Sequence, residues 1–175
     1  MRDDPRDDEV VRFEQAVLPH MNAAYNLARW LLGSGPDAED IVQESFLHAF
    51  KGFAKFRGGD GRAWLLTIVR NVCFTWLRKH RADSLTTEFD ESLHSPGEGG
   101  TSAEFTKHDI DPAQLQAAIE QLPAEFREAI VLRELEGLSY KEIAEIAGVP
   151  IGTVMSRLAR ARRQLREILT KDQPL

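Results

Sequence analysis

One acidic stretch, rich in serine, proline and glycine, divides this chain of 175 residues and limits its fold more than any other feature. Between residues 83 and 111, eight carboxylates face Lys107 alone, and the centre reads Ser95-Pro-Gly-Glu-Gly-Gly-Thr-Ser102. Such a composition, with no sustained helical period, is typical of a linker. We therefore predict a first domain at 1–82, a flexible acidic linker at 83–111 and a second domain at 112–175.

Apolar residues recur at steps of three and four on both sides of this linker, which predicts two small all-α domains. In the first domain one apolar stripe runs from Phe13 to Leu31, a second from Ala38 to Phe53 and a third from Trp64 to Leu77. Glycine-rich breaks at 33–35 and 58–61 separate the three stripes. Alternating, strand-like stretches are scarce, so we expect no sheet.

The second domain contains a segment, Leu138 to Arg157, that fits a helix-turn-helix. Ser139 and Glu142 have the spacing of a capping box, and Ala147-Gly-Val149 can form the tight turn. A long amphipathic helix follows, from Thr153 to Leu169, and its N-terminal residues would face base edges in a major groove. An ordinary helical hairpin is the alternative. The polar and basic outer face favours DNA; it comprises Thr153, Ser156, Arg157, Arg160 and Arg163.

The charge is distributed very unevenly, although the chain as a whole carries a formal net charge of −6. Residues 51–81 hold eight lysines and arginines against Asp60, and residues 150–166 hold five arginines and no acid. Two basic blocks on amphipathic helices indicate two surfaces for a polyanion. Solvated helix faces are the simpler alternative.

Two further helices carry candidate binding residues. The basic helix after Gly61 interleaves its cations with Trp64, Phe74 and Trp76, and aromatics can stack on unpaired bases. Trp64 and Trp76 lie on the apolar stripe, however, which favours a place in the core for these two. The helix at 37–46 presents Glu39, Asp40, Gln43 and Glu44 on one face. A helix N-terminus favours carboxylates, but such a face also suits a partner rich in arginine.

Several function classes are excluded. The single cysteine, Cys73, cannot form an internal disulfide, which excludes a secreted scaffold built on disulfides. No run approaches the ~20 apolar residues of a membrane span. The acidic N-terminus does not resemble a signal peptide, so we expect a cytoplasmic protein without membrane insertion. The histidines have no ligand spacing, and no phosphate loop or nucleophile motif occurs. We expect no catalytic residue, metal, cofactor or small-molecule substrate.

Five segments in order resemble the extracytoplasmic-function (ECF) sigma factors of bacterial RNA polymerase. They are Asp37-Ala-Glu-Asp-Ile-Val-Gln-Glu-Ser-Phe46, Phe56-Arg-Gly58, Trp64-Leu-Leu-Thr-Ile-Val-Arg-Asn71, the segment 122–140 and the segment 152–162. The resemblance covers about 10–82 and 112–170. It implies two helical domains that bind core polymerase, with the first reading and melting the −10 element and the second reading the −35 element. It also implies control by an anti-sigma factor.

The resemblance assigns residues to three surfaces. Core polymerase would be bound by Asp37, Asp40, Gln43 and Glu44. The −10 strand would be bound by Arg57, Arg62, Arg70, Asn71, Arg78 and Lys79, with Asn71 beside a flipped base. The −35 element would be bound by Thr153, Ser156, Arg157, Arg160, Arg162 and Arg163. Met155 stands where the family often has a basic residue, and no role is assigned to it or to Cys73.

Two other functions fit parts of the sequence. A stand-alone helix-turn-helix regulator would bind duplex DNA by itself, usually as a dimer, but it does not explain the acidic face or the basic aromatic helix. A sigma mimic that titrates an anti-sigma factor would tend to lose basic residues, whereas five arginines remain between 157 and 166.

Overall fold

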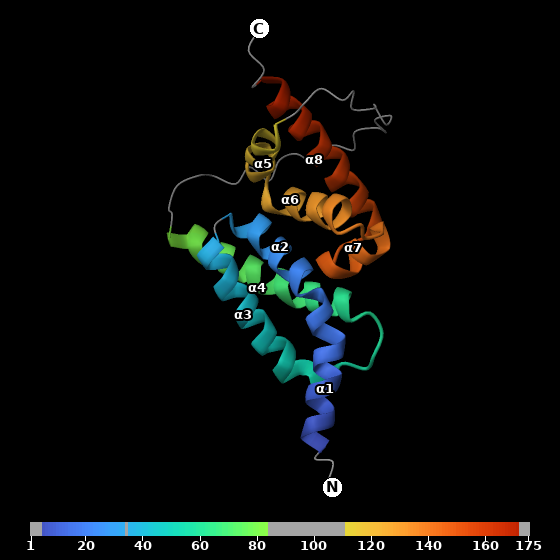
Figure 1. Cartoon of the computed structure of the whole chain (residues 1–175). Helices are drawn as coiled ribbons and strands as arrows, with labels where there is room; N and C mark the ends of the chain where they lie inside the picture. Colours follow the sequence, from blue (N-terminus) through green and yellow to red (C-terminus); the bar gives the residue numbers. More distant parts are fainter. Residues whose placement is uncertain (1–4, 34, 84–110, 172–175) are drawn as a thin grey trace.

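A computed structural model of the protein describes residues 5–33, 35–83 and 111–171, and every regular element in these ranges is helical (Figure 1). The predicted all-α fold is confirmed. The linker prediction falls almost wholly on residues 84–110, which lie outside the described residues. Asp111 lies inside them, and its side chain caps the next helix by accepting a hydrogen bond from the amide of Ala113 (3.2 Å).

The N-terminal unit, residues 5–83, holds four α-helices. They are α1 (Pro5–Val17), α2 (Met21–Leu32), α3 (Gly35–Gly52) and α4 (Gly61–Asp83), with 3-10 turns η1 (Leu18–His20) and η2 (Phe53–Lys55). The apolar stripe from Phe13 to Leu31 therefore belongs to two helices and not to one. Pro19 lies in η1, between the two helices, and it has no amide hydrogen with which to continue the hydrogen bonds of α1.

The core of the N-terminal unit lies where α2, α3 and α4 pack together. Leu27, Leu31, Leu65 and Leu66 are almost completely buried in it. The first residue of α4 is Gly61, and a Cβ at this position would overlap the carbonyl of Ala16 at the end of α1. Only glycine lets α4 begin so close to α1.

The C-terminal unit, residues 111–171, is built on the predicted helix-turn-helix. Its elements are α5 (Pro112–Glu120), α6 (Ala124–Ile130), a π-helical turn η3 (Val131–Leu135), α7 (Tyr140–Ala147) and α8 (Ile151–Lys171). The predicted capping box begins α7: the Ser139 amide donates to Glu142 Oε2 (2.7 Å), and the Glu142 amide donates to Ser139 Oγ (3.2 Å). Gly148 ends α7 with a φ of 67°, as the turn requires.

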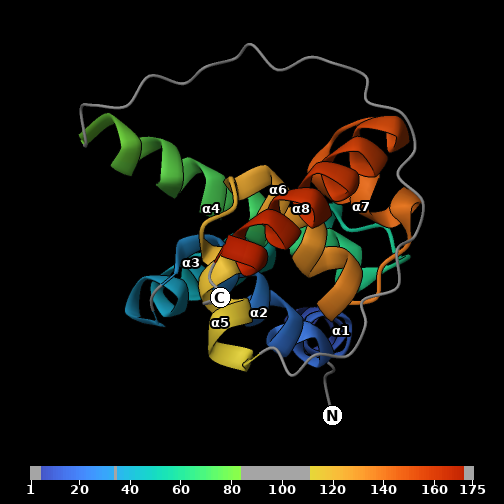
Figure 2. The same cartoon turned by 90° about the horizontal axis from the view of Figure 1, so that it is seen from above.

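The two units pack against each other, which the sequence did not predict. α7 lies on α4, and α6 lies on α2, as both views show (Figures 1 and 2). Buried residues of both units form one continuous apolar cluster. This contact partly covers two of the predicted site residues, Arg62 and Arg70.

Candidate nucleic-acid interface

The basic helix α4 begins at a loop shaped by glycine. Gly58 and Gly59 have φ values of 84° and 102°, which favour glycine, and Arg57 before them is exposed. Asp60 then caps the helix, since its Oδ1 accepts hydrogen bonds from the amides of Arg62 (2.9 Å) and Ala63 (3.3 Å). The loop thereby leaves one arginine in solvent and directs the next toward the C-terminal unit.

Two of the six predicted −10 residues contact carboxylates of the C-terminal unit. Arg62 Nη2 donates to Glu136 Oε2 (2.9 Å) and to the Glu136 carbonyl (2.6 Å). Arg70 Nε donates to Glu128 Oε1 (2.7 Å), and its guanidinium lies 4.3 Å from the ring centre of Phe74. Both arginines are only partly exposed in this arrangement.

The remaining predicted −10 residues lie at the surface. Arg57, Asn71, Arg78 and Lys79 are all exposed, and Arg78 Nη2 donates to Thr75 Oγ1 (3.2 Å). Asn71 and Lys79 line a groove of about 240 Å³ between α3 and α4, which Glu44 also lines. The structure thus brings one predicted polymerase-binding residue next to two predicted DNA-binding residues.

The acidic face of α3 is open to solvent. Asp40, Gln43 and Glu44 are exposed, and Asp37 in the first turn is partly buried. Glu44 Oε1 lies 3.6 Å from His48 Nε2, one turn farther along the helix. Three of the four predicted polymerase-binding residues can therefore meet a partner without any rearrangement of α3.

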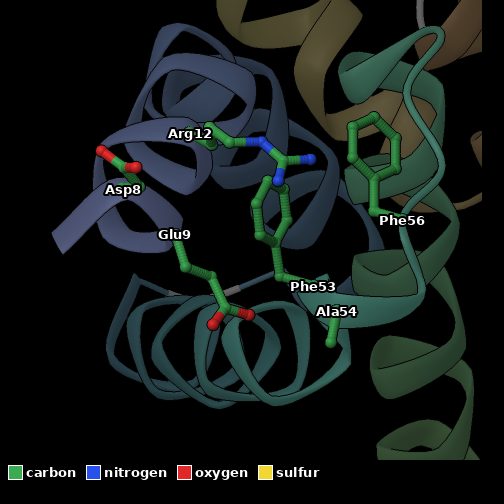
Figure 3. A pocket seen from close by; sticks show the side chains of 6 residues that line it. All are labelled: Asp8, Glu9, Arg12, Phe53, Ala54 and Phe56. Carbon is green, nitrogen blue, oxygen red and sulfur yellow. The ribbon is translucent and has the colours of Figure 1, made fainter. Parts of the chain in front are cut away.

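Aromatic side chains behind the loop pack on each other. Trp64 is partly buried, with its ring 4.9 Å from that of Phe56 and 6.1 Å from that of Phe53. An adjacent hollow has a volume of about 330 Å³. In it the Arg12 guanidinium extends over the Phe53 ring (Figure 3). Asp8 and Glu9 also line this hollow, so it lacks the positive balance that a phosphate would need.

The N-terminal half of α8 presents a mixed surface. Ser156 and Arg163 are exposed, as is Met155, which has 53% of its surface open. Thr153, Arg157, Arg160 and Arg162 are partly buried. Arg162 Nη2 donates to Glu134 Oε1 (2.7 Å), and this hydrogen bond raises the pKa of the Arg162 guanidinium. The predicted −35 residues lie on one helix, but they differ in how readily they can meet DNA.

Glu128 is a functional candidate that the sequence reasoning missed. Its side chain is 1% exposed and lies between arginines of both units, with Arg157 Nη1 3.9 Å from its second carboxylate oxygen. Burial raises the pKa of Glu128, while Arg70 and Arg157 lower it. Burial, together with the charge of Glu128, also raises the pKa of the Cys73 thiol to about 12.

Comparison with known proteins identifies the family. The family described as Sigma-70 region 2 matches residues 16–82, and Sigma-70, region 4 matches residues 113–165. The RNA polymerase sigma-H factor of Pseudomonas aeruginosa is 33% identical over 93% of this chain and 87% of its own length. The ECF RNA polymerase sigma factor EcfG of Rhodopseudomonas palustris is 34% identical over 90% and 83%, respectively. The chain belongs to the ECF sigma factors. The resemblance seen in the sequence is confirmed.

Other ECF relatives support the assignment at the level of sequence and fold. SigE of Mycolicibacterium smegmatis is 38% identical over 91% of this chain, which spans 62% of that relative's length. The sigma factor RpoE of Bartonella quintana, solved with the anti-sigma factor NepR, has a TM-score of 0.71 at 32% identity, covering 93% of this chain and 99% of that one. CnrH, solved with the cytosolic domain of CnrY, has a TM-score of 0.62 at 26% identity, with 92% and 89% covered. Sigma factors are transcription initiation factors rather than catalytic enzymes.

The charged contacts between the units of this ECF sigma factor involve one more residue that the sequence reasoning did not single out. Arg127 Nη1 donates to the carbonyls of Trp30 (2.9 Å) and Leu31 (3.2 Å) at the end of α2. A positive group at a helix C-terminus is favoured by the exposed carbonyls. The sequence did contain a signal for Glu128, the residue next to Arg127. Glu128 lies four residues after Ala124 and four before Leu132, so a charged residue occupies the buried face of the helix.

Proposed function

We propose that this chain binds core RNA polymerase and directs initiation at promoters that carry −35 and −10 elements. The observation that supports this most is the combination, in one chain of the ECF family, of a capped helix-turn-helix, a basic helix and an exposed acidic helix beside it. A stand-alone repressor needs only the first of these three surfaces. The chain performs no catalysis of its own and acts as a subunit of the holoenzyme.

The two DNA elements are divided between the two domains, at 1–82 and 112–175. In the second domain, Ser156 on the exposed side of α8 faces the −35 major groove, and the exposed Arg163 holds a phosphate. In the first domain, Asn71 receives an unpaired −10 base, because its amide can both donate and accept hydrogen bonds on a base edge. The surrounding cations hold phosphates, and opening of the duplex follows from capture of that base.

Core polymerase binds the acidic face of α3. Asp40, Gln43 and Glu44 form an exposed surface with two carboxylates, which suits a basic partner surface. The groove shared by Glu44 and Asn71 supports a common location for polymerase contact and strand capture. Because transcription acts on the chromosome, we propose a cytoplasmic location. Within residues 5–33, 35–83 and 111–171, no helix combines the length and the apolar character of a membrane span.

An anti-sigma protein controls the chain in this proposal. Support comes from the two structural relatives above, each of which was solved in a complex: RpoE with the anti-sigma factor NepR, and CnrH with the cytosolic domain of CnrY. The occupied arginines of α4 are consistent with a factor that is held inactive until it is released.

Transcription in vitro with purified core polymerase and a promoter library tests the proposal. The full chain should yield transcripts that share a −35 and a −10 motif, while core polymerase alone should not. Asp40→Arg/Glu44→Arg should reduce binding to core polymerase and leave helical content unchanged. A wild-type chain that binds duplex DNA tightly without polymerase, and never opens a promoter with it, would overturn the assignment.

A further inference from the structure

The contact between the two units pairs arginines of α4 with carboxylates of the C-terminal unit. Arg62 meets Glu136 at 2.9 Å, and Arg70 meets Glu128 at 2.7 Å. We call these four residues the interlock. The carboxylates come from α6 and from the residue just after the π-helical turn η3, whereas both arginines lie on the helix predicted to bind DNA.

Further hydrogen bonds, each between one charged and one neutral group, hold the same face. Asn26 Nδ2 donates to Glu136 Oε1 (3.3 Å), and Arg127 joins α6 to the last carbonyls of α2. Apolar residues of both units pack behind these contacts. The interlock therefore sits in a formed interface, where its side chains are held in position for charge-assisted hydrogen bonds.

A carboxylate and a phosphate compete for the same arginine. Both present paired anionic oxygens to the guanidinium donors, so an arginine that holds one has fewer donors left for the other. Glu136 and Glu128 thus occupy donors of Arg62 and Arg70 that a DNA strand would need. Glu128 also lies 3.9 Å from Arg157 of α8, so one carboxylate contacts a predicted reader of each promoter element.

The four side chains of the interlock are largely buried, so DNA cannot easily displace the carboxylates from the two arginines. The side chains of Glu128 and Glu136 are 1% and 9% exposed, and those of Arg70 and Arg62 are 18% and 29% exposed. Water screens such pairs less than it screens surface pairs. A DNA strand can bind these arginines only in molecules whose two units have separated. The apparent affinity for DNA is therefore the intrinsic affinity multiplied by the fraction of separated molecules.

We propose that Glu128 and Glu136 make the C-terminal unit an intramolecular competitor of the −10 strand, and that the closed arrangement is a self-inhibited state of the free chain. The inference rests on the proposed function only in naming the −10 strand as the displaced ligand. Closure itself is a property of the free chain and needs no polymerase.

A matched pair of charge reversals in the full chain tests the interlock. Glu136→Arg places a cation against Arg62 across the interface, whereas Glu134→Arg opposes Arg162 within the C-terminal unit. Both variants add the same charge on neighbouring positions. Two measurements follow for each: small-angle X-ray scattering of the free chain, and binding of a fluorescent, mixed-sequence single-stranded oligodeoxynucleotide.

We expect the wild type and Glu134→Arg to scatter as compact particles and Glu136→Arg to show a larger radius of gyration. Oligonucleotide binding should be about tenfold tighter for Glu136→Arg than for Glu134→Arg, which corresponds to ~1.4 kcal/mol. The milder Glu136→Gln should change both quantities in the same direction by less, and it keeps the test usable if the reversal prevents folding.

The proposal of self-inhibition would be overturned by an extended wild type, or by equal oligonucleotide affinities of the two matched variants. Transcription with core polymerase is measured separately. If scattering and oligonucleotide binding give the expected results but no transcription occurs, self-inhibition is supported and the proposed function is refuted. The two failures are therefore distinguishable.

Discussion

Replacement of Glu128 by alanine should destabilise the folded chain strongly. The change removes a carboxylate that is 1% exposed and bonded to Arg70 Nε at 2.7 Å. Breaking a buried ion pair by removing one partner typically costs ~3–5 kcal/mol. Because Arg70 and Arg157 are 18% and 21% exposed, they can turn partly toward water, so we expect the lower end of this range.

Urea denaturation measures this loss. With a slope of ~2 kcal/mol per molar urea, a loss of ~3 kcal/mol lowers the midpoint by ~1.5 M. Helical circular dichroism follows both units, whereas tryptophan fluorescence follows the N-terminal unit alone, since Trp30, Trp64 and Trp76 all belong to it. Glu128→Gln, which keeps an acceptor for Arg70, should lose less.

Glu134→Ala is the control, because Glu134 and its partner Arg162 are 51% and 40% exposed. Exposed pairs contribute ~0–1 kcal/mol. A double-mutant cycle of Glu128→Ala with Arg70→Ala should give a coupling energy of ~1–3 kcal/mol. A midpoint shift for Glu128→Ala no larger than that of the control would refute the reasoning.

Three further predictions follow from the described side chains. Asn71→Ala should leave binding to core polymerase unchanged and reduce open-complex formation, seen as weaker permanganate reactivity of promoter thymines; a normal footprint would contradict its role. The hydrogen bonds from Ser139 lower the pKa of Glu142. The stabilising effect of the Glu142 carboxylate is therefore present above the ordinary glutamate pKa of 4.5 and is lost as the pH falls through the lowered pKa. Glu142→Gln should make stability less dependent on pH in this acid range, as acid unfolding would measure. Cys73, whose pKa is raised to about 12, should react slowly with a disulfide reagent until the chain unfolds, and fast labelling of the native chain would show that the core opens.

Local features of the fold could be predicted from the sequence because neighbouring residues determine them. The capping box at Ser139 and the turn at Gly148 follow from spacing and residue type, and both are present. The break between α1 and α2 at Pro19 was missed, because apolar residues recur at helical steps on both sides of it. A helical period records which residues face inward, but it does not record whether the backbone hydrogen bonds continue.

The chemistry of the site was predictable only in part. Charge alone marks Arg62 and Arg70 as ligands for an anion, but it does not identify the anion. Their partners lie 74 and 58 residues away in sequence, so no local pattern connects them. The exposed face of Asp40 and Glu44 needed no such information, since a helix that packs through its opposite side leaves these residues outside. Their roles in binding stay predictions.

The position of Glu128 also has a consequence for evolution. Two arginines on different helices share this single carboxylate, so Arg157 still balances it after a substitution at Arg70, and the reverse holds as well. Losing both arginines leaves a buried charge without compensation, so their combined cost should exceed the sum of the separate costs. A neutral residue at 128 removes that penalty. Homologous sequences should therefore change positions 70, 128 and 157 as a covarying set, a pattern of epistasis between residues that are remote along the chain.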